Sequence, residues 1–442
     1  MKPLTSILSL TLLSFACRPA TPDGLVDAPL AEPAEPVASE VSLTLQRAGE
    51  PLERVTVIVH APDGSVLELR ETDASGSVVI DDVPAAGVGL TVPHRIFDHR
   101  DGWATVLGVT PGTTVRWGTP PPPPTVTVEA RFPRAFERAE RYTLGLGCRQ
   151  FTAYEAEHRA QMSVDASCLP HDIVDLYVVA YADSDRLAYA RLTGQPIVDG
   201  VVDADFGDVD WSTDFIDLPV VVTGAPDRLL AVLQASEGGL HRNVAPFTAA
   251  EILTRGDDWA VDVPMAPADR MESRLTLMNV SEEGEQRAIE VRRTAAIEST
   301  PSLELDLATE APTLPQGLSI AADHTRVTVH EPSDFACGDA STATARRLTL
   351  RGRLADEPLV WEVLSPATSA ETWERPELPA VLDDRWPLDD FEHLTADVEL
   401  LHHRSSSYGA IVGEPEPFVT FAAPWLDDDD IACTVRLSDA MP

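Results

Sequence analysis

The side chains with the clearest chemical potential are carboxylates that crowd one short segment. They are Asp203, Asp205, Asp208 and Asp210. Calcium prefers several oxygen ligands, and closely spaced aspartates in a loop can supply them. We therefore take these four residues as the candidate metal site. The segment lacks the ordered spacing and terminal glutamate of an EF-hand, so a solvated acidic loop is the alternative.

Other polar clusters give weaker predictions of a metal site. The four adjacent aspartates at 427–430 repel one another and are expected in solvent unless a cation bridges them. If the adjacent residues His402 and His403 lie on a strand, they point to opposite faces, which is poor geometry for chelation. A further group that could converge near the end of the first predicted domain consists of His94, Asp98, His99 and Asp101.

Short motifs of common enzyme classes are absent from the sequence. It contains no GxSxG elbow, no HExxH, no Walker loop and no dinucleotide-binding GxGxxG. Catalytic residues need not lie in short motifs, so this lowers the expectation of an enzyme without removing it. No catalytic or cofactor-binding residue is predicted.

The cysteines of the chain could form disulfide bonds. Beyond Cys17, the chain has Cys148, Cys168, Cys337 and Cys433, an even number that fits export to an oxidising compartment. Pairing neighbours gives Cys148–Cys168 and Cys337–Cys433, although four cysteines allow three connectivities. In the chain-entropy model each bridge contributes about 3–5 kcal/mol.

The elements that must position these residues are mostly strands. Apolar and polar residues alternate with a period of two from Val41 to Leu45 and from Val55 to Val59, as expected of half-buried strands. Two helices are predicted, one over Thr152–Met162 from its composition and one from the capping box Thr248–Glu251 to a stop at Gly256. The predicted fold class is all-β, with tandem β-sandwich domains and small helical insertions.

With 442 residues, the chain exceeds what one hydrophobic core usually holds. Shifts in composition predict the following division: a signal peptide at 1–16, a Pro- and acid-rich tether at 17–40, a first β-sandwich at 41–118, a polyproline linker at 119–124, a second β-rich domain at 125–225, and a C-terminal β-rich domain at 226–442.

The net charge argues against two classes of direct partner. The formal net charge is −39, with 72 acidic against 33 basic residues. Such a surface repels the phosphates of nucleic acids and anionic lipid headgroups, so neither is expected as a direct partner.

The N-terminus has the layout of a bacterial lipoprotein signal. Lys2 precedes an uncharged run from Leu4 to Ala16, and Leu13-Ser14-Phe15-Ala16-Cys17 resembles a degenerate lipobox. The resemblance implies lipidation at Cys17, and Arg18 after it favours the outer membrane, with the folded part facing the periplasm or the cell surface. Ser14 stands where the family usually has Leu, Val or Ile, so ordinary cleavage and secretion is the alternative. The run is shorter than the ~20 residues that a spanning helix needs.

A second resemblance covers residues 41–95. The runs Pro51–Val57, Asp63-Gly64, Thr72–Val78 and Val83-Pro84-Ala85 together resemble a carboxypeptidase regulatory-like domain. The resemblance implies a transthyretin-like β-sandwich of accessory type, and it carries over no catalytic residue.

These observations predict a non-enzymatic envelope or surface lipoprotein that acts as a structural or binding module. Its expected partners are the membrane, through the anchor at Cys17, and a protein or glycan. One alternative is a hydrolase acting on an envelope polymer, with converging acids or histidines between residues 125 and 442. The other is a calcium-dependent structural protein.

Overall fold

The chain divides into two units, Met1–Ala38 and Ser39–Pro442. The first unit, which contains Cys17 and the predicted signal, lies outside the residues described by the computed structural model. The described residues are 39–97, 100–119, 121, 124–146, 149–166, 169, 173–183, 185–225, 229–237, 247–254, 256–266, 270–279, 286–296, 302–307, 317–320, 326–330, 337, 343–354, 357–367, 372–374, 376–379, 392–403, 407–415, 417–418 and 431–438.

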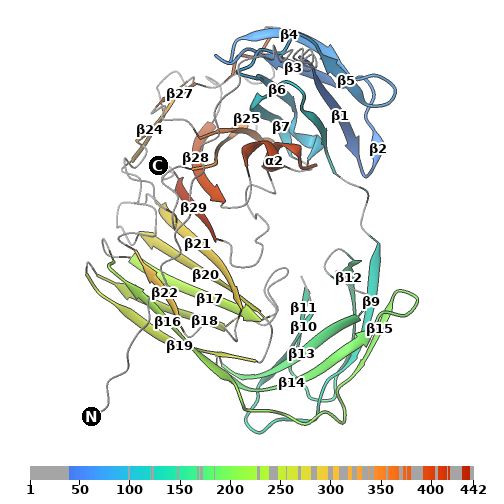
Figure 1. The fold of residues 1–442 in the computed structure, drawn as a ribbon, viewed down its shortest axis with the longest axis vertical. Coiled ribbons are helices and arrows are strands. Elements are labelled where there is room, and N and C mark those ends of the chain that lie inside the picture. Colours follow the sequence, from blue (N-terminus) through green and yellow to red (C-terminus); the bar gives the residue numbers. More distant parts are fainter. Residues whose placement is uncertain are drawn as a thin grey trace, which may run out of the picture. The chain divides into compact units, whose positions relative to one another are not determined.

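Strands dominate this part of the chain, which confirms the predicted all-β class (Figure 1). The described helical elements include the 3-10 turn η1 (His94–Ile96) and the helix α2 (Tyr408–Gly413), which Ser407 caps through its side chain. None of the described helices is both long and apolar enough to cross a membrane.

Residues 41–118 supply two facing sheets, as expected of a β-sandwich. One sheet contains β1 (Val41–Arg47), β2 (Glu50–Pro51), β5 (Ser77–Ile80) and β8 (Thr114–Trp117). The facing strands are β3 (Thr56–His60), β4 (Val66–Glu71), β6 (Val88–Pro93) and β7 (Asp101–Val109). Both sheets contribute buried residues to one core, among them Leu43, Val59 and Trp117. The transthyretin-like assignment itself stays a prediction.

The turns of this sandwich form as their residue types predict. Asp73 Oδ1 accepts hydrogen bonds from the backbone N–H groups of Ser75 and Ser77, at 2.8 and 2.9 Å. Gly76 follows with φ +74°, a conformation that costs glycine little. The Asp73–Gly76 turn thereby connects the edge strand of one sheet to the edge strand of the other.

A second sandwich follows the proline-rich segment. Its sheets contain β9 (Thr125–Arg131), β12 (Arg159–Asp165) and β15 (Val201–Asp205) on one side, and β10 (Arg141–Leu146), β11 (Arg149–Ala153), β13 (Ile173–Ala182) and β14 (Asp185–Pro196) on the other. Alternate residues such as Val128, Leu144 and Phe206 are fully buried between them.

The central feature is a sheet of 12 strands, in the order β18-β17-β20-β21-β29-β28-β25-β26-β7-β6-β3-β4. Its later strands are β17 (Leu229–Glu237), β18 (Phe247–Leu253), β20 (Arg270–Asn279), β21 (Gln286–Ala296), β25 (Ala345–Leu354), β26 (Glu357–Pro366), β28 (Glu392–His403) and β29 (Ile431–Ser438). The smaller sheets contain β16 (Ile216–Thr223), β19 (Trp259–Met265) and β22 (Leu303–Asp306), and β23 (Gly317–Ile320), β24 (Arg326–His330) and β27 (Thr372–Glu374).

One strand pair makes this sheet continuous. β26 lies parallel to β7, with Trp361 opposite Trp103 and Glu362 opposite Ala104. Strands from the predicted first and C-terminal domains therefore share backbone hydrogen bonds. The C-terminal strands and β7, β6, β3 and β4 of the first sandwich form one continuous sheet. The predicted domain boundaries stay predictions.

Both predicted helices are wrong. Thr152–Met162 is divided between β11 and β12, and Glu157 between them has φ +57°, which a right-handed α-helix does not accommodate. Thr248–Glu251 lies inside β18, which pairs with β17 over seven consecutive residues from Phe247 to Leu253. Local helix propensity is a weak preference, and pairing along a full strand outweighs it.

Candidate functional site

The predicted calcium residues lie on and after β15. Asp203 and Asp205 are exposed on this strand, and Asp205 Oδ1 accepts a 2.7 Å hydrogen bond from the backbone of Gly207. Arginines lie beside two of the four aspartates: Arg131 is 3.6 Å from Asp205, and Arg134 is 3.8 Å from Asp208. Asp210 is exposed. Within the described ranges, no three His, Cys, Asp or Glu side chains gather in a way that could hold a metal ion. Calcium binding stays a prediction.

Several other predicted residues fall outside the described part of the chain. They are Cys17, Asp98, His99, Cys148, Cys168 and the aspartates at 427–430. Asp101 is exposed at the start of β7, whereas His94 is buried in η1.

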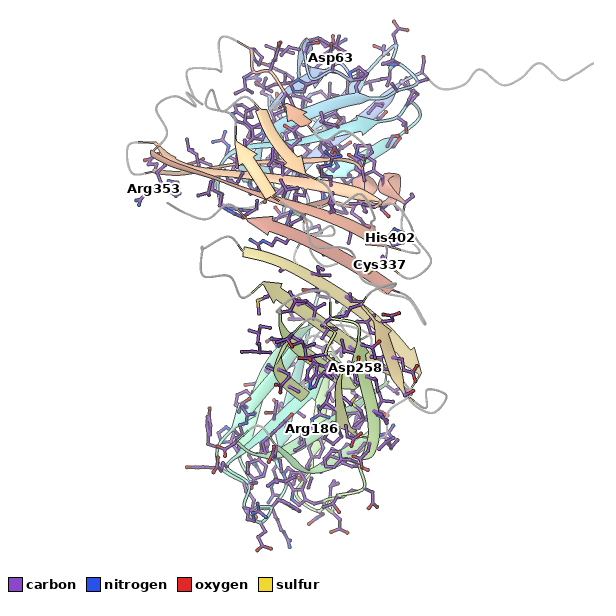
Figure 2. The ribbon with its side chains drawn as sticks, turned by 90° about the vertical axis from the view of Figure 1, so that its left-hand side faces the viewer. Asp63, Arg186, Asp258, Cys337, Arg353 and His402 are labelled. Carbon is purple, nitrogen blue, oxygen red and sulfur yellow. A yellow bond between two sulfur atoms is a disulfide. The ribbon has the colours of Figure 1, made fainter. Side chains whose placement is uncertain are left out.

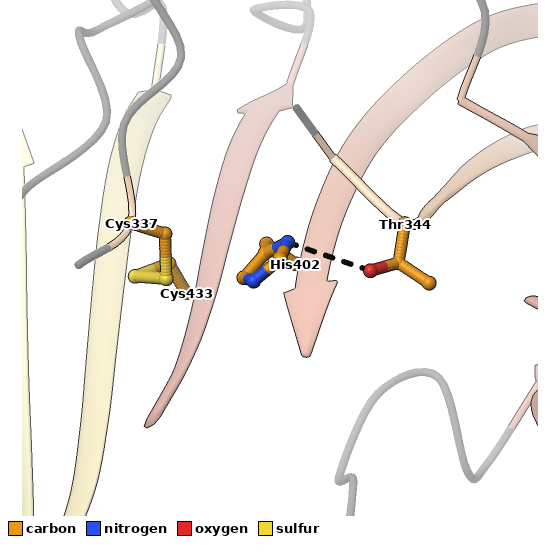
Figure 3. The surroundings of a disulfide bond; sticks show 4 residues. All are labelled: Cys337, Thr344, His402 and Cys433. Atoms are coloured by element: carbon orange, nitrogen blue, oxygen red, sulfur yellow. Dashed lines mark hydrogen bonds between the residues drawn. A yellow bond between two sulfur atoms is a disulfide. The ribbon is translucent and has the colours of Figure 1, made fainter. Parts of the chain in front are cut away.

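His402 lies beside the one disulfide that the described residues show, and Figure 2 labels it next to Cys337. Cys337 is bonded to Cys433, with their Cα atoms 5.9 Å apart. His402 is directly opposite Cys433 in the β28–β29 pair, and its Nδ1 is 3.5 Å from Thr344 Oγ1 (Figure 3). His403 follows on the same strand.

A set of charged side chains lies on one face of the 12-stranded sheet. Register places these residues on the same face of β20, β21, β29, β28, β25 and β26. We call this set the charged face; it consists of Arg274, Glu290, Arg347, Arg351, Glu362, Asp397, Glu399 and Arg436. The opposite face of the same strands is apolar and buried, with Leu277, Val398 and Leu348 among its residues.

Ion pairs cross the strands of the charged face. Arg347 is paired with Glu399, which is directly opposite it, and also donates to the carbonyl of Phe418. Arg351 and Arg436 both contact the same oxygen of Asp397, Oδ2, and Arg436 lies 3.4 Å from it. The carboxylates are nearly buried, whereas the side chains of Arg351 and Arg436 are 46% and 48% exposed. Around Asp397 the face therefore has a carboxylate beneath and two guanidinium groups toward solvent.

Glu362 lies on β26, where the charged face borders the first sandwich. His94 Nε2 lies 2.8 Å from Glu362 Oε2, and Arg100 lies 3.6 Å from the other carboxylate oxygen. The side chains of His94 and Glu362 are only 1% and 5% exposed. Burial by itself raises the pKa of the Glu362 carboxyl, but the hydrogen bond from His94 and the charges of His94, Arg347 and Arg100 outweigh it. The pKa of Glu362 is consequently lowered.

A buried chain of hydrogen bonds crosses the neighbouring strands. His60 Nε2 is 2.7 Å from Thr91 Oγ1, which is 2.7 Å from Thr105 Oγ1. Trp361 Nε1 donates to Thr105 Oγ1 at 2.9 Å. The chain links β3, β6, β7 and β26, so it supports the same junction as the Glu362–His94 pair.

His60 makes the stability of this junction depend on pH. Burial lowers the pKa of His60 from 6.5 to about 4, against a smaller opposing effect of the Gly64 carbonyl. Between these pH values the unfolded chain binds a proton that the folded protein does not. Acidification from pH 7 to 4 should therefore lower the free energy of unfolding by about 3 kcal/mol through this residue. Urea unfolding at several pH values measures it.

The matched variant is His60→Gln, which cannot titrate and keeps an amide near Thr91. We expect its free energy of unfolding to change less than that of the wild type between pH 6.5 and 4. Carboxyl groups with a lowered pKa, such as Glu362, take up protons and change the stability at lower pH. Parallel curves for the two proteins would show that His60 is not the source of the dependence.

Sequence reasoning did not find the charged face. The available signal is the alternation of arginines with apolar residues in Ala345–Leu354, where positions 347, 351 and 353 carry Arg. That pattern predicts a strand with one charged face. It does not reveal that Asp397, Glu399 and Arg436 come to lie beside it, because these strands are far apart in sequence.

No family model matches the chain, and no curated protein matches it either. Among solved structures, the Bacillus anthracis TIE protein aligns with 61% of this chain at 8% sequence identity and a TM-score of 0.15. The chain spans half the length of that protein, with 50% covered. A TM-score this low carries no argument about fold or function.

Proposed function

We propose that the protein is a non-enzymatic envelope lipoprotein that acts as a structural or binding module for a protein or glycan partner. A lipid at Cys17 anchors it, and the proline- and acid-rich tether at 17–40 separates the folded part from the outer membrane. The carboxypeptidase regulatory-like resemblance of residues 41–95 supports an accessory role of this kind.

The observation that carries the binding role is the charged face. It extends over six hydrogen-bonded strands, so the sheet fixes the backbone positions from which its side chains extend. The side chains of Arg274, Arg351 and Arg436 are partly accessible to solvent, whereas the carboxylates paired with them are mostly covered. A rigid surface with positioned donors can recognise a partner at little entropic cost.

The strongest argument for the alternative, a hydrolase, is the pair His94–Glu362. A histidine hydrogen-bonded to a carboxylate is a common acid–base arrangement. Both side chains are almost completely buried, however, and they join η1 to β26. We therefore interpret the pair as a structural contact between the first sandwich and the C-terminal strands.

Two measurements test the proposal. Labelling cells with palmitate should label the wild-type protein and leave Cys17→Ser unlabelled and released from the membrane fraction. Co-sedimentation of the purified protein with envelope fragments of its own bacterium should show saturable binding. A Cys17→Ser protein that stays membrane-bound would contradict the anchor, and the lack of saturable binding would contradict the binding role.

A further inference from the structure

We propose that Arg351 and Arg436 form a binding site for an oxyanion, the carboxylate or phosphate group of a ligand. This inference rests on the proposed binding function and names the chemistry of the partner that the charged face would recognise. Arg274 lies on the same face two strands beyond Arg436 and extends the surface along which a longer anionic ligand would lie.

The first argument is the convergence of two guanidinium groups on one atom. Arg351 comes from β25 and Arg436 from β29, on either side of β28. Both contact Asp397 Oδ2, so their guanidinium groups lie close to each other over β28. Asp397 holds the two groups in place from below, since its side chain is 10% exposed.

The second argument is the number of guanidinium N–H donors of Arg351 and Arg436 beyond those that contact Asp397 and Glu399. A guanidinium group has five N–H donors in a planar fork. Arg351 donates one hydrogen bond from its guanidinium, to Asp397, and Arg436 contacts Asp397 and, at 3.6 Å, Glu399. Nearly half of each side chain is exposed. Carboxylate and phosphate oxygens match the remaining donors, because they accept such forks in a bidentate manner.

The third argument is local charge. Acidic residues outnumber basic ones 72 to 33 in the whole chain, but the charged face holds four arginines and four carboxylates. Partial burial, and then the positive charges of Arg436, Arg100 and Arg347, lower the pKa of Arg351, against an opposing effect of the Glu362 carboxylate. Cations that disfavour one another are stabilised by an added anion.

The net charge of −39 also limits the ligand. Repulsion from the acidic surface is screened beyond about 8 Å at physiological ionic strength, whereas contact with Arg351 and Arg436 is direct. A ligand with separated charges is therefore favoured over a densely charged polyanion.

The experiment is isothermal titration of the detergent-solubilised full-length protein with inorganic phosphate and, separately, with trigalacturonate. The two arms distinguish a phosphate from a carboxylate source. We expect saturable binding of at least one of the two, weakened about tenfold or more in Arg351→Gln and in Arg436→Gln. The matched control is Arg70→Gln, because Arg70 is a 41% exposed arginine in an ion pair on β4.

Removing a guanidinium leaves Asp397 less well compensated, so the melting temperature of each variant is measured as well. Arg351→Lys keeps the charge and loses the fork, and it should bind the anion more weakly than the wild type while folding normally. No saturable heat from either anion, unchanged affinity in Arg351→Lys and Arg436→Gln, or an equal loss in Arg70→Gln would each overturn the inference. If envelope fragments still bind in that case, the oxyanion site fails and the proposed function stands.

Discussion

Replacing Glu362 with glutamine is expected to lower the free energy of unfolding by about 3–5 kcal/mol, the usual effect of removing one partner from a buried ion pair. The side chain fills the same space in the variant, so the effect comes from charge and hydrogen bonding. Glu362 compensates His94 and Arg100, which approach its two carboxylate oxygens from the first sandwich. Urea unfolding followed by tryptophan fluorescence measures the change, since Trp361 precedes Glu362 and is fully buried.

A double-mutant cycle makes this prediction specific. His94→Gln removes the other partner, and the double variant should cost clearly less than the sum of the two single variants. Glu129→Gln, an exposed glutamate on β9, is the control and should change stability by less than about 0.5 kcal/mol. Additive costs for Glu362 and His94 would mean that the 2.8 Å contact between them contributes little.

The acid dependence of the variant gives an independent check. The lowered pKa of Glu362 means that its carboxylate adds stability above the pKa of the unfolded chain and loses it as the pH falls. Glu362→Gln should therefore remove part of the stability loss below about pH 4.5. His60 accounts for loss at higher pH, between its unfolded value of 6.5 and about 4.

The strands of this protein could be predicted from sequence because the signal for them is local. Val41, Leu43 and Leu45 alternate with polar residues, and in β1 all three are fully buried. The turns at Asp63 and Asp73 depend on local residue types as well. Both carry residues that bond their own backbone and a glycine that adopts positive φ.

The arrangement of the strands could not be predicted, because it depends on contacts between distant segments. Glu362 and His94 are 268 residues apart, and neither has a neighbour in sequence that indicates the other. The parallel pairing of β7 with β26 could not be predicted for the same reason. The capping-box pattern at Thr248 was misleading for a related reason: the partner that fixes Thr248–Glu251 as a strand is β17, which a local pattern does not include.

Removing the Cys337–Cys433 disulfide is the second change with a large expected effect. The bond joins residues 96 apart in sequence and encloses β25, β26 and β28 in one loop. In the chain-entropy model, a loop of about 100 residues contributes up to about 4.7 kcal/mol by restricting the unfolded chain. We expect Cys337→Ala to lower the free energy of unfolding by about 2–5 kcal/mol, as measured by urea denaturation without reductant.

Cys433→Ala and the double variant supply the control within the same experiment. Once either cysteine is gone the loop is open, so the double variant should be scarcely less stable than the single variants. With reductant present in all samples, which also opens the predicted Cys148–Cys168 bridge, the wild type and the variants should unfold at nearly the same midpoint. Costs that add fully in the double variant would mean that the two buried side chains contribute by packing alone.

Cys433 lies in β29, between β21 and β28, so the loss of the disulfide should weaken the strands that hold Arg436 in the charged face. The Cys433→Ala protein is accordingly expected to lose oxyanion affinity as well, which links the covalent bond to the proposed site.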